Sequence, residues 1–203
     1  MIQAFLYGVI LAFGLIVPLG VQNIFIFNQG ATQKRLMHAL PSVFTAFLCD
    51  TILILCAVLG VSILVFTIPW LKTTIFVAGF FFLMYMGWIT WNSQSQSKPN
   101  EKPLSAKYQI GFALSVSLLN PHALIDTIGV IGTNSLNFIG QEKVIFTFAC
   151  ILVSFFWFLG LSLSGHYFKK VDKNGMGIKY LNKISAIVIW LVAAYIGWQI
   201  VCE

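Results

Sequence analysis

Residues 3–27 read QAFLYGVILAFGLIVPLGVQNIFIF, an uninterrupted run without a charged side chain. A helix needs about 20 apolar residues to cross the hydrocarbon core of a bilayer. The same run contains Pro18 and Gly20, followed by the amides Gln22 and Asn23. A proline inside a helix removes a backbone hydrogen bond and disfavours helical backbone in the residue before it. This stretch therefore predicts a transmembrane helix that is broken near its middle.

The rest of the chain repeats this apolar character. Of its 203 residues 59% are apolar and only 9% are charged, against roughly 25% charged in an average soluble domain. No basic leader or cleavage site precedes the first run, so we expect a retained helix and not a signal peptide. Continuous apolar runs do not fit the alternating pattern of a barrel. The sequence predicts an all-α membrane protein with a single domain over residues 1–203. Its six transmembrane helices are expected near residues 3–27, 40–66, 69–92, 108–134, 143–167 and 184–202.

The basic residues are distributed unevenly between the two predicted faces. The connections after the first, third and fifth spans carry ten of them, and the opposite face carries two, Lys72 and Lys143. Under the positive-inside rule the richer face is cytoplasmic, so both termini are expected on the non-cytoplasmic side. The net charge of +6 then reflects topology and contact with anionic lipids, and not nucleic acid. The ten residues are Lys34, Arg35, Lys98, Lys102, Lys107, Lys169, Lys170, Lys173, Lys179 and Lys183.

Two sequence features recur in matching order. The tetrapeptide Tyr-x-Gly-Trp occurs at residues 85–88 and again 110 residues later at 195–198, and Pro18 is matched by Pro121, 103 residues later. Three spans per half is an odd number, so the second half must enter the membrane from the opposite face. Inverted repeats with matching broken helices are typical of secondary transporters. The sequence predicts two inverted three-helix repeats, about residues 1–92 and 108–203, joined by the polar connection 93–107, with the first and fourth spans broken.

Two carboxylates lie inside predicted spans. They are Asp50 in the second span and Asp126 in the fourth, where a charge costs roughly 2.5–3.5 kcal/mol to insert. Their presence suggests a cation, a proton or both as ligand. Asp126 also lies four residues after His122, and a structural pair of these two side chains on a helix is the alternative interpretation. No basic residue lies near Asp50 in its own span.

The residues around both breaks resemble motifs of one known family. Residues 18–23, PLGVQN, are similar to the first-span signature of the lysine/arginine exporter family (LysE/ArgO), and Asn120-Pro121-His122 followed by Asp126-Thr127 is similar to its fourth-span signature. Val21 departs from the pattern, since family members often carry a small residue or proline there. The resemblance covers essentially the whole chain. It implies export of L-arginine or L-lysine across the bacterial inner membrane, driven by the proton-motive force.

The resemblance and the residue chemistry together give a candidate site at the membrane midplane. Backbone donors and amides at the breaks suit the substrate carboxylate, and Asp50 and Asp126 suit its cationic groups. A buried carboxyl group is easily protonated when empty and ionised when a cation binds, so Asp50 and Asp126 are also the proton-coupling candidates. We expect a transporter and not an enzyme, with no cofactor and no bound metal. The partners are the amino acid, protons and lipids, and a homo-oligomer is an open alternative. The predicted substrate-binding residues are Pro18, Gly20, Gln22, Asn23, Asn120, Pro121, His122, Asp126 and Thr127.

Three other functions remain open from the residues alone. The substrate could be another small amino acid. It could also be a metal cation, for which His122, Asp50 and Asp126 would be ligands. Finally, Cys49 and Cys150 lie 101 residues apart in the second and fifth spans, which admits a membrane thiol–disulfide electron carrier.

Overall fold

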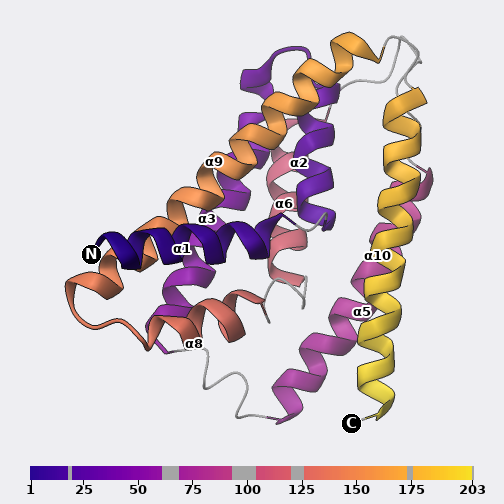
Figure 1. The fold of residues 1–203 in the computed structure, drawn as a ribbon. Helices are drawn as coiled ribbons and strands as arrows, with labels where there is room; N and C mark the ends of the chain where they lie inside the picture. The colour runs from indigo at the N-terminus through magenta and orange to yellow at the C-terminus, as the bar shows by residue number, and fades with distance from the viewer. Residues whose placement is uncertain (18–19, 61–68, 93–103, 120–125, 173–175, 203) are drawn as a thin grey trace.

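The computed structural model describes residues 1–17, 20–60, 69–92, 104–119, 126–172 and 176–202. Every regular element in these ranges is helical, as the continuous apolar runs predicted (Figure 1). The elements are α1 (Ile2–Ile16), α2 (Val21–Thr32), the 3-10 helix η1 (Leu36–His38), α3 (Leu40–Val58), α5 (Pro69–Asn92), α6 (Ala106–Leu119), the π-helix η2 (Asp126–Ile131), α8 (Gly132–Ser135), α9 (Gln141–Val171) and α10 (Met176–Cys202).

Two described helices are long and apolar enough on their own to cross a membrane. These are α3 and the portion Gln141–Phe168 of α9. The pair α1 and α2 adds a third span if it is counted as one broken helix, because its two axes differ by 82°. Helix α5 has 24 residues and α10 has 27. At a rise of about 1.5 Å per residue, both helices are longer than the hydrocarbon core of a bilayer is thick. The chain is a helical membrane protein, and the full count of six spans stays a prediction.

The second predicted span, residues 40–66, is described only in part. Helix α3 ends at Val58, and residues 61–66 lie outside the described residues. Gly60 adopts φ 79°, a left-handed conformation that glycine reaches without strain, and its N–H donates to the carbonyl of Ala57 at 3.2 Å. This backbone geometry ends a helix even though the following residues are as apolar as those before it.

Helix α9 is the centre of the packing. It runs obliquely across the molecule, and α1, α2 and α3 all pack against it, while α6 packs against α3 (Figure 1). The crossing of α2 and α9 is very close: a Cβ atom added to Gly30 would lie 2.0 Å from the carbonyl oxygen of Ser162. A Cβ atom on Gly165 would lie equally close to the carbonyl oxygen of Phe27. Small residues let membrane helices approach and gain packing energy where the hydrophobic effect does not drive association.

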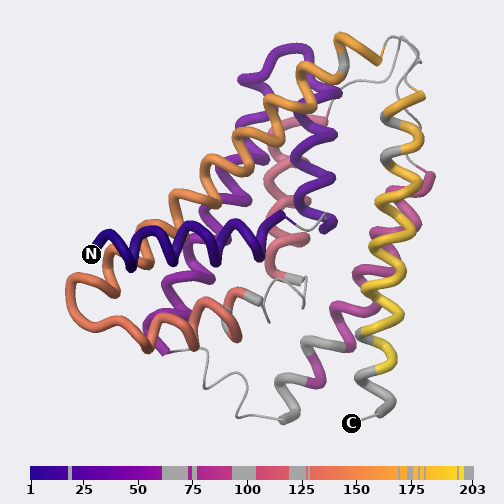
Figure 2. The backbone as a smooth tube through the Cα atoms, viewed as in Figure 1, coloured from indigo at the N-terminus to yellow at the C-terminus, as the bar shows by residue number. Residues whose placement is uncertain are grey.

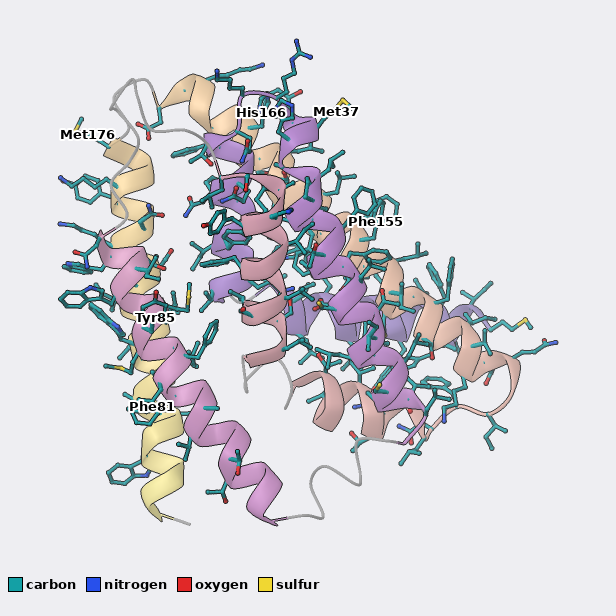
Figure 3. The ribbon with its side chains drawn as sticks, turned by 180° about the vertical axis from the view of Figure 1, so that it is seen from behind. Met37, Phe81, Tyr85, Phe155, His166 and Met176 are labelled. Carbon is teal, nitrogen blue, oxygen red and sulfur yellow. The ribbon has the colours of Figure 1, made fainter. Side chains whose placement is uncertain are left out.

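Helices α5 and α10 form a separate antiparallel pair beside this bundle (Figure 2). The pair meets the bundle mainly through a cluster of buried side chains that includes Val21 and Ile24 of α2. Its outer surface is apolar: Phe81 and Tyr85, one turn apart on α5, are 66% and 62% exposed (Figure 3). An apolar outer surface is what a helix pair in contact with lipid requires.

The glycines of the repeated tetrapeptide make the same contact twice. A Cβ atom on Gly87 of α5 would meet the indole of Trp190 on α10, and one on Gly197 of α10 would meet the ring of Phe80 on α5. Gly87 and Gly197 are 110 residues apart, and so are Phe80 and Trp190. The same shift of 110 residues thus relates the two glycines and the two aromatic residues, and each helix supplies the glycine to one contact and the ring to the other. Two helices related by a two-fold axis make such reciprocal contacts.

Candidate functional site

Asp50 lies where three helices meet. It is carried by α3 and is partly buried. One carboxylate oxygen, Oδ1, accepts a hydrogen bond from Nε2 of Gln22 on α2 at 3.3 Å. The other, Oδ2, accepts one from the hydroxyl of Ser154 on α9 at 2.9 Å. The structure therefore brings together Asp50 and Gln22, an amide of the first motif.

The donors around Asp50 carry no charge. The ion pair between the Met1 ammonium group and Glu142, at 2.7 Å, is exposed and does not involve Asp50. A carboxylate accepts about four hydrogen bonds, and two neutral donors leave part of that capacity unused. A charge held only by neutral groups in an apolar surrounding is unstable unless a cation or a proton joins it. Both oxygens of Asp50 thus have a neutral donor, and part of their hydrogen-bonding capacity is free for a further ligand.

The start of α2 supplies the complementary polarity. Gly20 is the N-cap, with extended backbone (φ −84°, ψ 173°), and no side chain caps the helix there. Val21, Gln22 and Asn23 follow and are 4%, 7% and 5% exposed, so this helix end is buried. The first N–H groups of a helix have no partner within it and carry its positive dipole end. The first turn of α2 thus presents buried N–H groups with partial positive charge, and Gln22 of the same turn contacts the carboxylate of Asp50.

Asn23 repairs the break between α1 and α2. Its Nδ2 donates to the carbonyl of Ile16, the last residue of α1, at 2.7 Å. Its Oδ1 accepts a hydrogen bond from the indole Nε1 of Trp157 on α9 at 3.2 Å. Because a carbonyl can only accept and an indole N–H can only donate, these two partners fix the orientation of the amide. Trp157 thereby positions Asn23, the residue of α2 whose side chain is hydrogen-bonded to the end of α1.

The second motif is described only in part. Pro18 of the first motif and Asn120, Pro121 and His122 of the second lie outside the described residues. Asp126 is the first residue of η2, but its side chain is also outside the description; Thr127 follows it and is half-buried. Helix η2 packs against α3, the helix that carries Asp50. A π-helix is rare and often marks a functional position, so the described backbone of the second motif is consistent with a site there.

Ser154 and Trp157 belong to this site, and the sequence analysis did not find them. They lie one turn apart on α9 and reach Asp50 and Asn23, which are far away in the chain. The available signal was small: a single hydroxyl and a single indole within the apolar run ACILVSFFWF. Their spacing of three places both on one helix face, which is the feature that could have suggested a pair.

The cysteines and possible metal ligands give no second site in the described ranges. Cys49 and Cys150 are buried, and neither forms a disulfide there. The thiol of Cys150 lies 3.6 Å from the carbonyl oxygen of Gly8, at the crossing of α1 and α9. No group of three His, Cys, Asp or Glu side chains suited to a metal ion occurs among the described residues.

Comparison with known proteins identifies the family. The model of the LysE type translocator family matches residues 13–199. The chain is 50% identical over 202 residues to the "Putative amino-acid transporter YisU" of Bacillus subtilis (strain 168), covering 99% of this chain and 92% of that protein. It is 30% identical over 198 residues to the arginine exporter protein ArgO of Salmonella typhi, covering 95% and 92%. It is 28% identical over 204 residues to ArgO of Serratia proteamaculans (strain 568), covering 98% of both.

No solved structure matches the chain. The family resemblance carried by the two break motifs is confirmed by a model match across nearly the whole length. The chain therefore belongs to the LysE type translocator family and is a membrane transporter.

Proposed function

We propose that this protein exports basic amino acids, with L-arginine as the first candidate and L-lysine as the second, across the bacterial inner membrane. The observation that carries the proposal is Asp50, a carboxylate inside a membrane helix whose described partners, Gln22 and Ser154, are both neutral. The names of the ArgO relatives, which match over nearly the whole chain, support arginine as the substrate.

The two polarities of the site suit the two charges of an amino acid. The uncapped N–H groups at the start of α2 would bind the substrate carboxylate, as helix N-termini bind anions generally. Asp50 would bind a cationic group of the substrate or carry the coupled proton. Asn120, Pro121, His122, Asp126 and Thr127 would complete the site from the second half. In this arrangement Asp126 contacts the substrate, because it lies in the second motif.

The reciprocal contacts support the inverted-repeat architecture. Gly87 and Gly197 exchange roles across the α5–α10 pair. A similar exchange relates the two broken segments: Gly30 of α2 packs on Ser162 of α9, and Gly132 of α8 packs on Ala57 of α3 with its added Cβ 3.2 Å from the carbonyl oxygen. Each broken segment thus lies on the middle helix of the other half. With the lysine-rich loops in the cytoplasm, both termini would face outward.

Proton coupling follows from the surroundings of Asp50. With only neutral described donors, its carboxyl group can carry a proton in the empty state and release it when a cationic substrate binds. Exchange of the two on one carboxylate would link export of the amino acid to entry of a proton, and would make the transporter an antiporter. The proton-motive force would then drive export.

A second substrate class is favoured by one comparison. YisU, at 50% identity, is named only as an amino-acid transporter. Export of another small amino acid therefore stands beside the basic ones. Two of the three ligands that the metal-cation alternative requires, His122 and the side chain of Asp126, lie outside the described residues. Cys49 and Cys150, the pair of the thiol–disulfide alternative, are free and buried thiols in the described ranges.

The experiment that tests the function is efflux from loaded cells. Cells with and without the protein are loaded with labelled arginine, lysine, threonine or citrulline, and the initial efflux rates are compared. Arginine efflux is expected to rise at least several-fold, and a protonophore should remove the increase. Citrulline, which has the shape of arginine without its charge, is the matched control. Equal stimulation of citrulline and arginine would contradict a site built on a carboxylate.

Trp157→Phe tests the positioning of the first break. Phenylalanine keeps an aromatic ring in place but lacks the N–H group that holds Asn23. We expect arginine efflux to fall several-fold while thermal stability in detergent drops little, because one hydrogen bond contributes only about 1 kcal/mol. Trp88→Phe on α5, where the indole is 64% exposed, is the control. Equal rates for the two variants would show that the Asn23 contact does not matter for transport.

A further inference from the structure

Three buried glutamines gather at the lysine-rich end of the bundle. Gln29 and Gln33 lie at the end of α2, and Gln109 lies in the first turn of α6; they are 4%, 2% and 1% exposed. This end also carries Met37 of η1 and His166 of α9 (Figure 3). Glutamine is mostly an exposed residue, so three buried ones at one place require an explanation.

The glutamines share a compact set of hydrogen bonds. Nε2 of Gln33 donates to the carbonyl of Leu104 at 3.0 Å and to Oε1 of Gln29 at 3.3 Å. Nε2 of Gln109 donates to the same Leu104 carbonyl at 3.0 Å and to the carbonyl of His38 at 2.9 Å. These bonds fasten the end of α2 and the turn after it, both from the first half, to the start of α6 in the second half. We call this cluster of Gln29, Gln33 and Gln109 the amide latch.

The amide latch is not fully satisfied. Oε1 of Gln109 is buried and has no hydrogen-bond partner among the described residues. A buried polar atom without a partner costs free energy, so each such atom in a native protein calls for an explanation. Water reaching Gln109 would satisfy this oxygen. A conformation that exposes this oxygen to water would relieve that cost, whereas the four hydrogen bonds of Gln33 and Gln109 are made in the described conformation.

A second polar contact closes the opposite end. The hydroxyl of Tyr7 on α1 donates to Oδ1 of Asn134 on α8 at 2.6 Å. Beside it the Met1 ammonium group donates to Glu142, at the start of α9. Both contacts are exposed, unlike the amide latch. We call the pair Tyr7 and Asn134 the tyrosine latch; it fastens the start of α1 to the end of the second broken segment.

The two latches occupy corresponding places in the two halves. Pro18 and Pro121 are 103 residues apart, and the residue 103 positions after Tyr7 is the neighbour of Gln109 in the sequence. The same offset carries the end of α2 to α8. Each latch thus joins the first helix of one half to the end of the broken segment of the other half. Their locations at the two ends of the bundle can be followed in Figure 2, where the turn after α2 and the N-terminus lie far apart.

We propose that the amide latch and the tyrosine latch are the two opposing gates of the transport cycle, one at each membrane face. This inference rests on the proposed transport function. Breaking the amide latch admits water and solute from the lysine-rich face, and breaking the tyrosine latch admits them from the other face. Alternating access requires that the two are not open together, so weakening one latch shifts the population toward access from its own side.

Native Cys49 is a suitable reporter of this access. It is 3% exposed and adjacent in sequence to Asp50. With Cys56, Cys150 and Cys202 replaced by serine, its modification by a membrane-impermeant thiol reagent is followed in sealed vesicles, from each side in turn. A separate variant with cysteine at Lys34 identifies which side is the lysine-rich face. Gln109→Leu removes both hydrogen bonds of that side chain, and Tyr7→Phe removes only a hydroxyl group.

The two variants are expected to act in opposite directions. Gln109→Leu should increase Cys49 modification from the lysine-rich face several-fold, and Tyr7→Phe should increase it from the other face. Gln3→Leu, at an exposed glutamine on α1, should change neither rate. Should Gln109→Leu fail to give monodisperse protein, Gln33→Met removes the other donor to Leu104 and carries the same expectation. No change, or a change in the same direction for both latches, would overturn the gate assignment.

The same vesicles separate this inference from the proposed function. Opposite shifts in Cys49 modification without any arginine export would uphold the two gates and remove the substrate assignment. Normal arginine export with unchanged Cys49 modification in both variants would uphold the function and remove the gates.

Discussion

Asp50→Asn is expected to reduce arginine export to the rate of cells without the protein, a loss of at least ten-fold. Asparagine has nearly the shape of aspartate and can keep the contacts with Gln22 and Ser154. The neutral amide is also easier to bury than a carboxylate, so membrane insertion and yield should equal those of the parent. What the variant lacks is the negative charge that receives the cation or the proton. Initial efflux rates, normalised to the amount of protein in the membrane, measure the effect.

The pH dependence of binding separates loss of charge from loss of shape. In the parent protein labelled arginine should bind more weakly as the pH falls, because protonation of Asp50 removes the charge that attracts the substrate. In Asp50→Asn binding should be weak at every pH. Asp172→Asn, at the end of α9 and away from the site, is the control and should behave as the parent does. An Asp50→Asn protein that exports arginine at the parental rate would remove this carboxylate from the mechanism.

Gly165→Ala is expected to have the largest effect on assembly of the bundle. The added methyl group would lie 2.0 Å from the carbonyl oxygen of Phe27, well inside the distance at which atoms repel. Helices α2 and α9 would have to separate, and the contacts that both Asn23 and Asp50 make with α9 would be lost with them. Overpacking of this kind typically costs about 1–3 kcal/mol, and more where the obstacle is backbone.

Gly160 supplies a matched control on the same helix. A Cβ atom added there meets nothing within 4 Å, so Gly160→Ala should equal the parent or exceed it slightly because alanine favours helix. The midpoint of thermal unfolding and the monodispersity of both variants in detergent give the comparison. Should Gly165→Ala prove as stable as Gly160→Ala, α2 and α9 do not cross as closely as described.

The sequence predicted the elements of this site better than it predicted their partners. Apolar runs predict the helices, and Pro18 and Gly20 predict the break, because both features depend on local chemistry. Asp50 could be selected because a carboxylate in an apolar run has no local explanation. Its neighbours are different: Ser154 is 104 residues away, and nothing near it in the chain distinguishes it from a serine that packs against lipid or another helix.

Local backbone conformations could not be predicted from the sequence either. The end of α3 is decided by the left-handed conformation of Gly60, yet the membrane-spanning runs contain other glycines that do not end a helix. The π-helix η2 begins at Asp126, and no residue type predicts that the backbone widens there. Such features are set by how segments from different halves pack, which periodicity along one segment does not encode.

The antiparallel pair of α5 and α10 has a consequence for biosynthesis. Gly87 packs against Trp190, which is translated about a hundred residues later. At roughly 5–20 residues per second, α5 is in the membrane for some 5–20 seconds before its partner emerges from the ribosome. During that interval its glycine surface is covered only by lipid or by the insertion machinery. The slow step in making this protein is therefore expected to be the meeting of its two halves, and a chain truncated before α10 would leave α5 as an unpaired target for quality-control proteolysis.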